Sequence, residues 1–193
     1  MSRSTSIGLI GELTVAHYLS KLSDVYRVLH EVWLACPSDV HPLDLDVAQV
    51  DHLVIGPFGI AVLETKWWNA DAIWFDERDG LCRIRRQGEV FTRRNPMAQN
   101  EWHVEMVRRV LARFRIYGLP IYNIIVLRPK IQFIGFRTHK TTMVVKVDRL
   151  LDVLSHLPKA DEVDIDECYR AITWYQANDP DDLWMIRCRF RKV

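Results

Sequence analysis

Two carboxylates and a lysine are spaced to act together in the stretch of residues 49–66. Apolar runs flank the turn sequence Gly-Pro-Phe-Gly at 56–59, which predicts a β-hairpin. If the turn is centred in that sequence, Asp51 lies directly opposite Glu64 on the neighbouring strand. Lys66 shares the face of Glu64, because side chains two residues apart in a strand point the same way. The pattern predicts an Asp, a Glu and a Lys projecting together from the end of an apolar hairpin.

Adjacent carboxylates repel each other, and a divalent cation removes that conflict. Carboxylate oxygens suit Mg²⁺ or Mn²⁺, and Mg²⁺ is typically held by one or two carboxylates with water and substrate phosphate. The nearby lysine is able to orient or help deprotonate a water, or to stabilise charge on a phosphate. The chemistry that fits is metal-assisted phosphodiester hydrolysis. The alternative is a surface hairpin that ends in solvated charges with a Glu–Lys pair.

Composition bounds the class of protein. A chain of 193 residues is long enough for one domain with a real core, so we expect a single domain over residues 1–193. Its formal net charge of +1 requires any nucleic-acid surface to be a local patch. The four cysteines are scattered without a zinc or disulfide pattern, which favours reduced thiols and a cytoplasmic location. We expect no membrane contact, since there is neither a signal-peptide segment nor an apolar run of membrane-spanning length.

The segments before the hairpin predict a helix over residues 6–22 and a strand over residues 26–34. The helix has helical apolar spacing, with an expected buried face of Leu9, Leu13, Ala16 and Leu19 or Tyr18. Gly8 and Gly11 predict a close approach of this helix to another backbone. Glu12, near the helix start, is by itself most simply a residue favoured by the helix dipole.

Aromatic and basic residues follow the hairpin. Trp67 and its neighbours are able to stack on nucleobases or to pack a strand edge. Residues 76–91 predict a further hairpin, and the arginines within and after it, including Arg93 and Arg94, form a phosphate-contacting patch or a solvated face.

The second half of the chain predicts one long helix, three strands and two shorter helices. Asn95 is a suitable N-cap and Pro96 a suitable first residue for a helix that runs to about residue 117. Expected strands cover residues 121–127, 131–134 and 141–147, expected helices cover 148–157 and 165–176, and the basic tail at 187–193 is a last strand or an arm. Because the central hairpin is apolar on both faces, the expected fold is an α/β layered core.

The chemistry-bearing residues also occur in a characteristic order. The set consists of Gly11-Glu12, Val50-Asp51-His52, Gly59-Ile60, Glu64-Thr65-Lys66, Asn95-Pro96 and Gln99. It resembles the nuclease-related domain (NERD) of the PD-(D/E)XK nuclease superfamily. Glu-x-Lys alone is a weak signal, whereas the ordered set with Asn-Pro-x-x-Gln opening a helix is fairly specific. The chain departs modestly from the family at Val50 and at Trp67-Trp68, and neither departure changes a ligand type.

The resemblance implies an α/β fold with a PD-(D/E)XK nuclease-like core, in which helices flank a mixed central β-sheet. It also implies that Asp51 and Glu64, with the backbone carbonyl of Thr65, hold Mg²⁺ or Mn²⁺. Lys66 would position the attacking water in that arrangement.

Two further residues and the partners follow from the same resemblance. Glu12 would join the site as an additional carboxylate, and Gln99 would steady the substrate or a ligand residue. Many relatives are fused to helicase, kinase or zinc-binding domains, so this chain is expected to act alone or with a separate helicase-type partner. Whether the chain forms a homodimer is left open.

We therefore carry three hypotheses for function. The first is a Mg²⁺-dependent nuclease that hydrolyses DNA phosphodiester bonds, with RNA left open as a substrate. The second is a non-catalytic nucleic-acid-binding module that retains the nuclease fold, since a fold does not guarantee chemistry. The third is a protein-interaction module. The intact Asp, Glu and Lys favour the first, because a binder needs no adjacent carboxylates facing phosphate.

Overall fold

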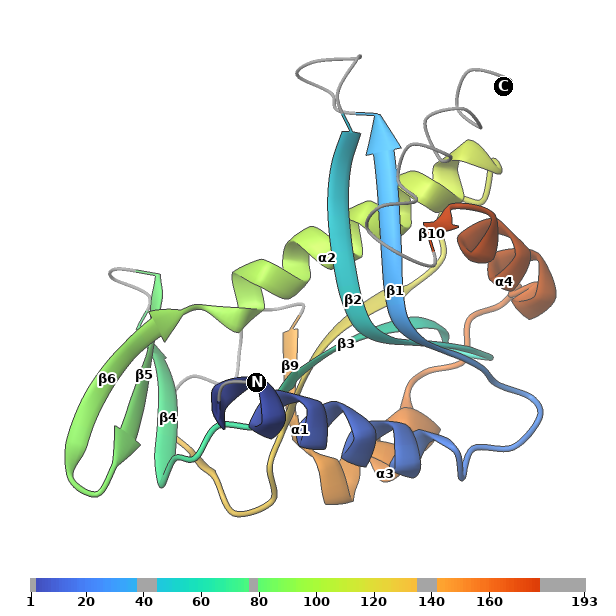
Figure 1. The fold of residues 1–193 in the computed structure, drawn as a ribbon. Coiled ribbons are helices and arrows are strands. Elements are labelled where there is room, and N and C mark those ends of the chain that lie inside the picture. The colour runs from blue at the N-terminus through green and yellow to red at the C-terminus, as the bar shows by residue number, and fades with distance from the viewer. Residues whose placement is uncertain (1–2, 38–44, 77–79, 135–141, 178–193) are drawn as a thin grey trace. The chain divides into compact units, whose positions relative to one another are not determined.

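The computed structural model describes residues 3–37, 45–76, 80–134 and 142–177. Six consecutive strands follow the first helix, and helices and further strands make up the rest of the described chain (Figure 1). In chain order the elements are α1 (Arg3–Leu19), β1 (Arg27–Pro37), β2 (Leu45–Gly56), β3 (Gly59–Lys66), β4 (Ala72–Asp76), β5 (Leu81–Arg86), β6 (Glu89–Arg94), α2 (Pro96–Arg113), β7 (Ile121–Leu127), β8 (Gln132–Phe133), β9 (Thr142–Lys146), the 3₁₀ turn η1 (Val147–Arg149), α3 (Leu150–His156), α4 (Ile165–Trp174) and β10 (Gln176–Ala177). The basic tail at 187–193 lies outside the described residues.

The principal sheet has six strands in the order β10-β1-β2-β3-β7-β9. It is mixed, because β1 pairs antiparallel with β2 and β10 whereas β7 and β9 are parallel. A smaller sheet has the order β6-β5-β4-β8, in which only the β4–β8 pair is parallel. The expected α/β fold, with a mixed sheet flanked by helices, is therefore confirmed.

The chain forms two compact units, each of which combines three segments of the sequence. Unit 1 comprises Met1–Leu22, Leu63–Glu101 and Tyr122–Leu157. Unit 2 comprises Ser23–Val62, Trp102–Ile121 and Pro158–Val193. Strand β3 and helix α2 each contribute residues to both units. The expectation of one domain over residues 1–193 stays a prediction.

Each unit has its own apolar cluster. In unit 2, α4 contacts β1 and β2, and the buried residues around Val50, Met106 and Ile172 form one core. In unit 1, Ile73 and Cys82 of the small sheet pack with residues of β7 and the start of α2, while α1 contacts α3 and η1. The apolar spacing read from the sequence thus builds two cores.

The central hairpin forms as predicted. β2 ends at Gly56 and β3 begins at Gly59, which leaves Pro57 and Phe58 as the turn. Gly59 has a φ of +106°, in the region that favours glycine. The backbone oxygen of Pro120 lies against it and accepts a hydrogen bond of 3.0 Å from the Ile60 amide. The glycine therefore permits both the turn and this close approach.

Two helix predictions need correction. In α1, Leu19 is buried as expected, but Leu9 and Leu13 are 46% and 61% exposed, and the buried series is Gly11, Val15 and Leu19. Both series have the four-residue spacing of a helix face, so spacing alone did not decide between them. The second helix ends at Arg113, earlier than the expected residue 117. Among the described residues, no helix is long and apolar enough to cross a membrane.

Candidate active site

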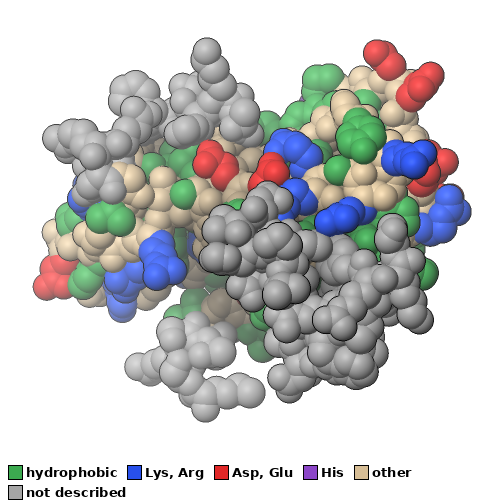
Figure 2. Space-filling view, turned by 90° about the horizontal axis from the view of Figure 1, so that it is seen from above, with side chains coloured by type: hydrophobic (Ala, Val, Ile, Leu, Met, Phe, Trp, Pro, Cys, Tyr) green, Lys and Arg blue, Asp and Glu red, His purple; other side chains and the backbone are tan. Residues whose placement is uncertain are grey.

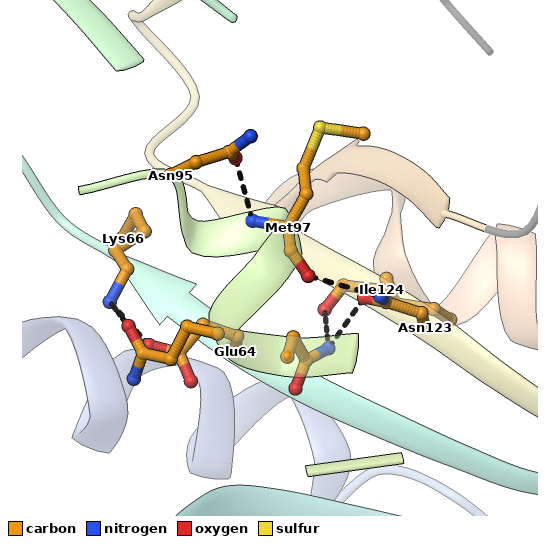
Figure 3. Close-up of polar contacts among 8 residues, drawn as sticks. Glu64, Lys66, Asn95, Met97, Asn123 and Ile124 are labelled. Atoms are coloured by element: carbon orange, nitrogen blue, oxygen red, sulfur yellow. Dashed lines mark hydrogen bonds and ion pairs between the residues drawn. The ribbon is translucent and has the colours of Figure 1, made fainter. Parts of the chain in front are cut away.

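The end of β3 carries a buried ion pair. Glu64 is 2% exposed, and the ammonium of Lys66 donates to its Oε1 (Figure 3). The Lys66 side chain is itself only 18% exposed. The two residues share one face of the strand because they are two positions apart. An acid and a cation are therefore held together where a strand of the principal sheet ends.

The environment of Glu64 disfavours an isolated negative charge. Burial is the largest influence, and it raises the pKa of this carboxyl above its ordinary value. The charge and hydrogen bond of Lys66 oppose that rise, whereas the negative charge of Glu12 adds to it. The Glu12 and Glu64 carboxylates are thus close enough to repel, and an additional cation between them would relieve the repulsion.

Helix α1 brings Glu12 to the site through a glycine contact. A Cβ added to Gly11 would lie 2.5 Å from the Cβ of Trp67, the residue that follows Lys66. A close approach therefore occurs at Gly11, but its partner is the Trp67 side chain and not the backbone that the sequence predicted. It does not occur at Gly8, where an added Cβ would meet no atom within 4 Å.

Gly11→Ala should consequently displace either α1 or Trp67, because real Cβ atoms do not approach to 2.5 Å. We expect the substitution to destabilise the protein by about 1–3 kcal/mol, as other overpacked contacts do. Urea unfolding measures this change. Gly8→Ala is the matched control and should be neutral or stabilise by up to about 1 kcal/mol, since alanine favours a helix. If both variants unfolded alike, Gly11 would not set the position of α1.

The first turn of α2 brings Gln99 to the same ion pair. Asn95 caps the helix as predicted, its Oδ1 accepting from the Met97 amide at 2.9 Å. One turn later, Gln99 Oε1 accepts from Lys66 Nζ at 3.3 Å. A hydrogen bond between Gln99 and Glu64 also opposes the rise of the Glu64 pKa. Gln99 therefore contacts both members of the ion pair.

Two buried amides that the sequence reasoning missed hold this turn of α2 in place. Asn100 and Asn123 are 0% and 3% exposed, and Asn100 Nδ2 donates to Asn123 Oδ1 at 2.7 Å. Asn123 Nδ2 donates in turn to the Met97 carbonyl at 3.4 Å (Figure 3). The bonds tie the helix start to β7. One signal was present in the sequence, because an asparagine within the apolar strand at 121–127 needs a buried partner.

Asp51 lies in β2 and is half-buried, within unit 2. Its position opposite Glu64 stays a prediction. The β1–β2 register pairs His30 with His52 and Val32 with Val50, and between them Glu31 has a φ of +50° and no register partner. The ladder is therefore interrupted beside Asp51.

The neighbour of Asp51 is a buried histidine. His52 is 2% exposed, and its Nδ1 lies 2.7 Å from His30 Nδ1. Burial, and then the charge of His30, lower the pKa of His52 to about 3. His52 is therefore neutral in neutral solution, and the two rings share one hydrogen bond.

The donor set is compatible with a hard divalent cation. Glu12, Glu64 and the backbone carbonyl of Thr65 offer oxygen atoms only, and oxygen ligands suit Mg²⁺ or Mn²⁺. Within the described ranges, no three or more His, Cys, Asp or Glu side chains group closely enough to hold a metal ion by themselves. A Mg²⁺ site needs only one or two carboxylates and completes its shell with water and phosphate.

The residues proposed for nucleic-acid contact lie beside this site in the chain. Trp67 is half-buried against Gly11, so it has at least a packing role. Arg93 and Arg94 are exposed on β6, and they point to opposite faces because they are consecutive in a strand. Stacking by Trp67 and phosphate binding by the two arginines stay predictions.

Comparison with known families supports the nuclease-related interpretation. The model of one family, described as the nuclease-related domain, matches residues 7–128, well over half of the chain. That range contains the ion pair and the residues that surround it. No curated protein and no solved structure matches the chain significantly. On the extent of the family match, the chain belongs to the nuclease-related domain family.

Proposed function

We propose that this protein is a metal-dependent nuclease that hydrolyses phosphodiester bonds in DNA. The observation that carries the proposal is the buried Glu64, ion-paired with Lys66 and repelled by Glu12. A structural ion pair needs no second carboxylate whose negative charge raises the pKa of the first. A site that binds a divalent cation gains from a second carboxylate, because the cation neutralises both negative charges and in turn attracts a phosphate.

The site residues would have different roles in metal binding and hydrolysis. Glu64, the Thr65 carbonyl and Asp51 would hold Mg²⁺ or Mn²⁺, with Glu12 as a further carboxylate. When bound, the cation would supply Lewis acidity at the phosphate and lower the pKa of a bound water. Lys66, whose ammonium already donates to Glu64, would orient the attacking water or meet the negative charge that develops on the phosphate.

Gln99 would limit the freedom of Lys66. Its Oε1 accepts from the Lys66 ammonium, so the lysine is held from two sides. The buried bonds of Asn100 and Asn123 keep the helix turn that carries Gln99 in place. Such preorganisation is what electrostatic stabilisation of a transition state requires.

The test combines metal binding with cleavage. Calorimetry with Mg²⁺ and Mn²⁺ would compare the wild type with Asp51→Asn, and plasmid and single-stranded DNA would serve as substrates for both. We expect Asp51→Asn to weaken metal binding at least 10-fold, the scale on which altered ligand shells act, and to abolish measurable cleavage. Asp161→Asn removes the same charge from an exposed position and should behave as wild type.

Metal-dependent cutting that is lost only in Asp51→Asn supports the nuclease. Metal binding without cutting of either substrate would support the metal site and indicate a different substrate or a missing partner. No binding of metal, even with DNA present, would reject a catalytic role and favour the non-catalytic nucleic-acid-binding module. An interaction module would show neither metal dependence nor a salt-sensitive affinity for DNA.

A further inference from the structure

The small sheet has two faces of different chemistry. On one face Ile73, Cys82 and Ile84 are buried and pack with Met97 and residues of β7. The opposite face carries the alternate residues, which include Trp74, Arg83, Arg85 and, on β6, Arg94. We call these four residues the arginine face.

The strand register makes the arginine face continuous. Arg83 lies directly between Trp74 on β4 and Thr92 on β6. Arg85 is two positions from Arg83 on the same strand, about 7 Å away at the usual strand rise. Arg94 pairs with Leu81, which makes it the diagonal neighbour of Arg83. The three guanidinium groups therefore start from adjacent sites on one face.

The β5–β6 hairpin carries more positive than negative charge. Residues 81–94 contain five arginines and one glutamate, whereas residues 71–79 before them contain four acidic residues and one arginine. Neither Arg85 nor Arg94 forms an ion pair with any part of the chain that the structure describes. Figure 2 shows Lys and Arg side chains at the left of the view, over the β5–β6 hairpin, and others at the right. Like charges on neighbouring strand positions are destabilising, and Arg85 and Arg94 have no described ion-pair partner to offset that cost.

We propose that the arginine face binds the phosphate backbone of a single-stranded nucleic acid, with the Trp74 ring available to stack on an unpaired base. Arginine binds phosphate with two parallel hydrogen bonds. An aromatic ring beside a cationic strip is the usual combination for single strands, whose bases are free to stack on it. The occupant follows from charge complementarity, because a polyanion would neutralise Arg85 and Arg94, which form no ion pair with the described residues.

The position of the face connects it to the candidate active site, so this inference rests on the proposed function. β6 ends at Arg94, Asn95 caps α2, and Gln99 contacts Lys66 one turn later. A strand bound to the arginine face is therefore held within the same unit as Glu64 and Lys66.

The experiment measures binding without cleavage. A fluorescein-labelled dT20 oligonucleotide would be titrated with protein in EDTA, and anisotropy would be recorded between about 0.05 and 0.3 M salt. We expect Arg85→Gln/Arg94→Gln to lower the salt slope by about 1.4, since each phosphate contact to a single strand contributes about 0.7. That difference corresponds to roughly 20-fold weaker binding near 0.1 M salt. Trp74→Leu should weaken binding about 5-fold or more, and Trp74→Phe should retain most of it.

A matched control removes the same charge elsewhere. Arg86→Gln/Arg149→Gln changes two exposed arginines of unit 1 that are not on the arginine face, and it should bind dT20 as the wild type does. Equal weakening of dT20 binding by both double variants would overturn the proposal, because the loss of two positive charges anywhere on the unit would then explain the weaker binding. Absence of dT20 binding by the wild type, or tighter binding of a 20-base-pair duplex, would also overturn it.

Cleavage assays on the same variants distinguish this inference from the proposed function. If Arg85→Gln/Arg94→Gln bound dT20 normally while the wild type still cut DNA, the arginine face would be rejected and the nuclease would stand. If binding fell as expected and no protein cut DNA, the arginine face would stand and the nuclease would be rejected.

Discussion

Lys66→Met should slow DNA hydrolysis by about 10²–10³-fold, the loss that follows removal of one positioned donor in a catalytic site. Methionine keeps the length of the side chain and removes the ammonium that donates to Glu64 and Gln99. The substitution should also destabilise the protein by about 3 kcal/mol, because it leaves the Glu64 carboxyl, which is 2% exposed, without its cation. Initial rates on plasmid DNA and urea unfolding measure the two effects.

Glu64→Gln separates chemistry from folding. Glutamine has nearly the same shape, and its carbonyl still accepts from Lys66, so the expected loss of stability is only about 1 kcal/mol. Its neutral amide is a poorer ligand for a divalent cation, and we expect hydrolysis to fall at least as far as in Lys66→Met. Lys146→Met, at the exposed end of β9, controls for loss of a lysine. Hydrolysis by Glu64→Gln at the wild-type rate would remove the ion pair from the catalytic machinery.

Gly59→Ala should destabilise the protein by at least about 3 kcal/mol. The residue has a φ of +106°, and an added Cβ would lie 2.3 Å from the backbone oxygen of Pro120. Strain at such a φ costs about 1–3 kcal/mol, and the overpacked contact adds a similar amount. The start of β3 would have to move, because the opposing atom is backbone and has no rotamer to change. The midpoint of urea unfolding gives the free-energy difference.

Gly118→Ala provides the matched comparison within unit 2. Its φ is +73°, but an added Cβ would meet no atom within 4 Å. We expect a cost of about 1 kcal/mol, from backbone strain alone. The difference between the two variants therefore measures the close approach to Pro120. A Gly59→Ala protein no less stable than Gly118→Ala would mean that the strand start adapts easily.

The hairpin was predictable because its signals are local. Gly56 and Gly59 bound a two-residue turn, and the strands on either side contain runs of apolar, β-favouring residues. Strand alternation alone places Lys66 on the face of Glu64. The Asn95 cap was equally predictable, since a cap depends on residues only two or three positions apart.

The buried face of α1 was not predictable in the same way. The helix has apolar residues around much of its circumference, so the expected face of Leu9, Leu13, Ala16 and Leu19 satisfies the helical period as well as the buried series of Gly11, Val15 and Leu19. The choice between them depends on what the helix packs against. The Trp67 side chain, fifty-six positions further along the chain, packs so closely against Gly11 that a larger residue would not fit there.

The contacts around Lys66 also depend on tertiary structure. Strands β4, β5 and β6 lie between Lys66 and Gln99 in the chain, and Asn100 donates a hydrogen bond to a partner in β7. Family resemblance marked Gln99 as a site residue, but no pattern in the sequence gave its contact with the lysine. Nor did any pattern separate Arg93 from the arginine face, since that division follows from the register of β5 and β6.

The fold class, the hairpin, the helix cap and the types of residue able to do chemistry could be predicted from residues that are neighbours along the chain. The burial of Glu64, the repulsion from Glu12 and the contact of Gln99 with Lys66 became visible in the folded structure alone. Those properties arise from burial and from distances between residues far apart in the chain. They are also the properties that set the charge balance of the site, on which the proposed hydrolysis depends.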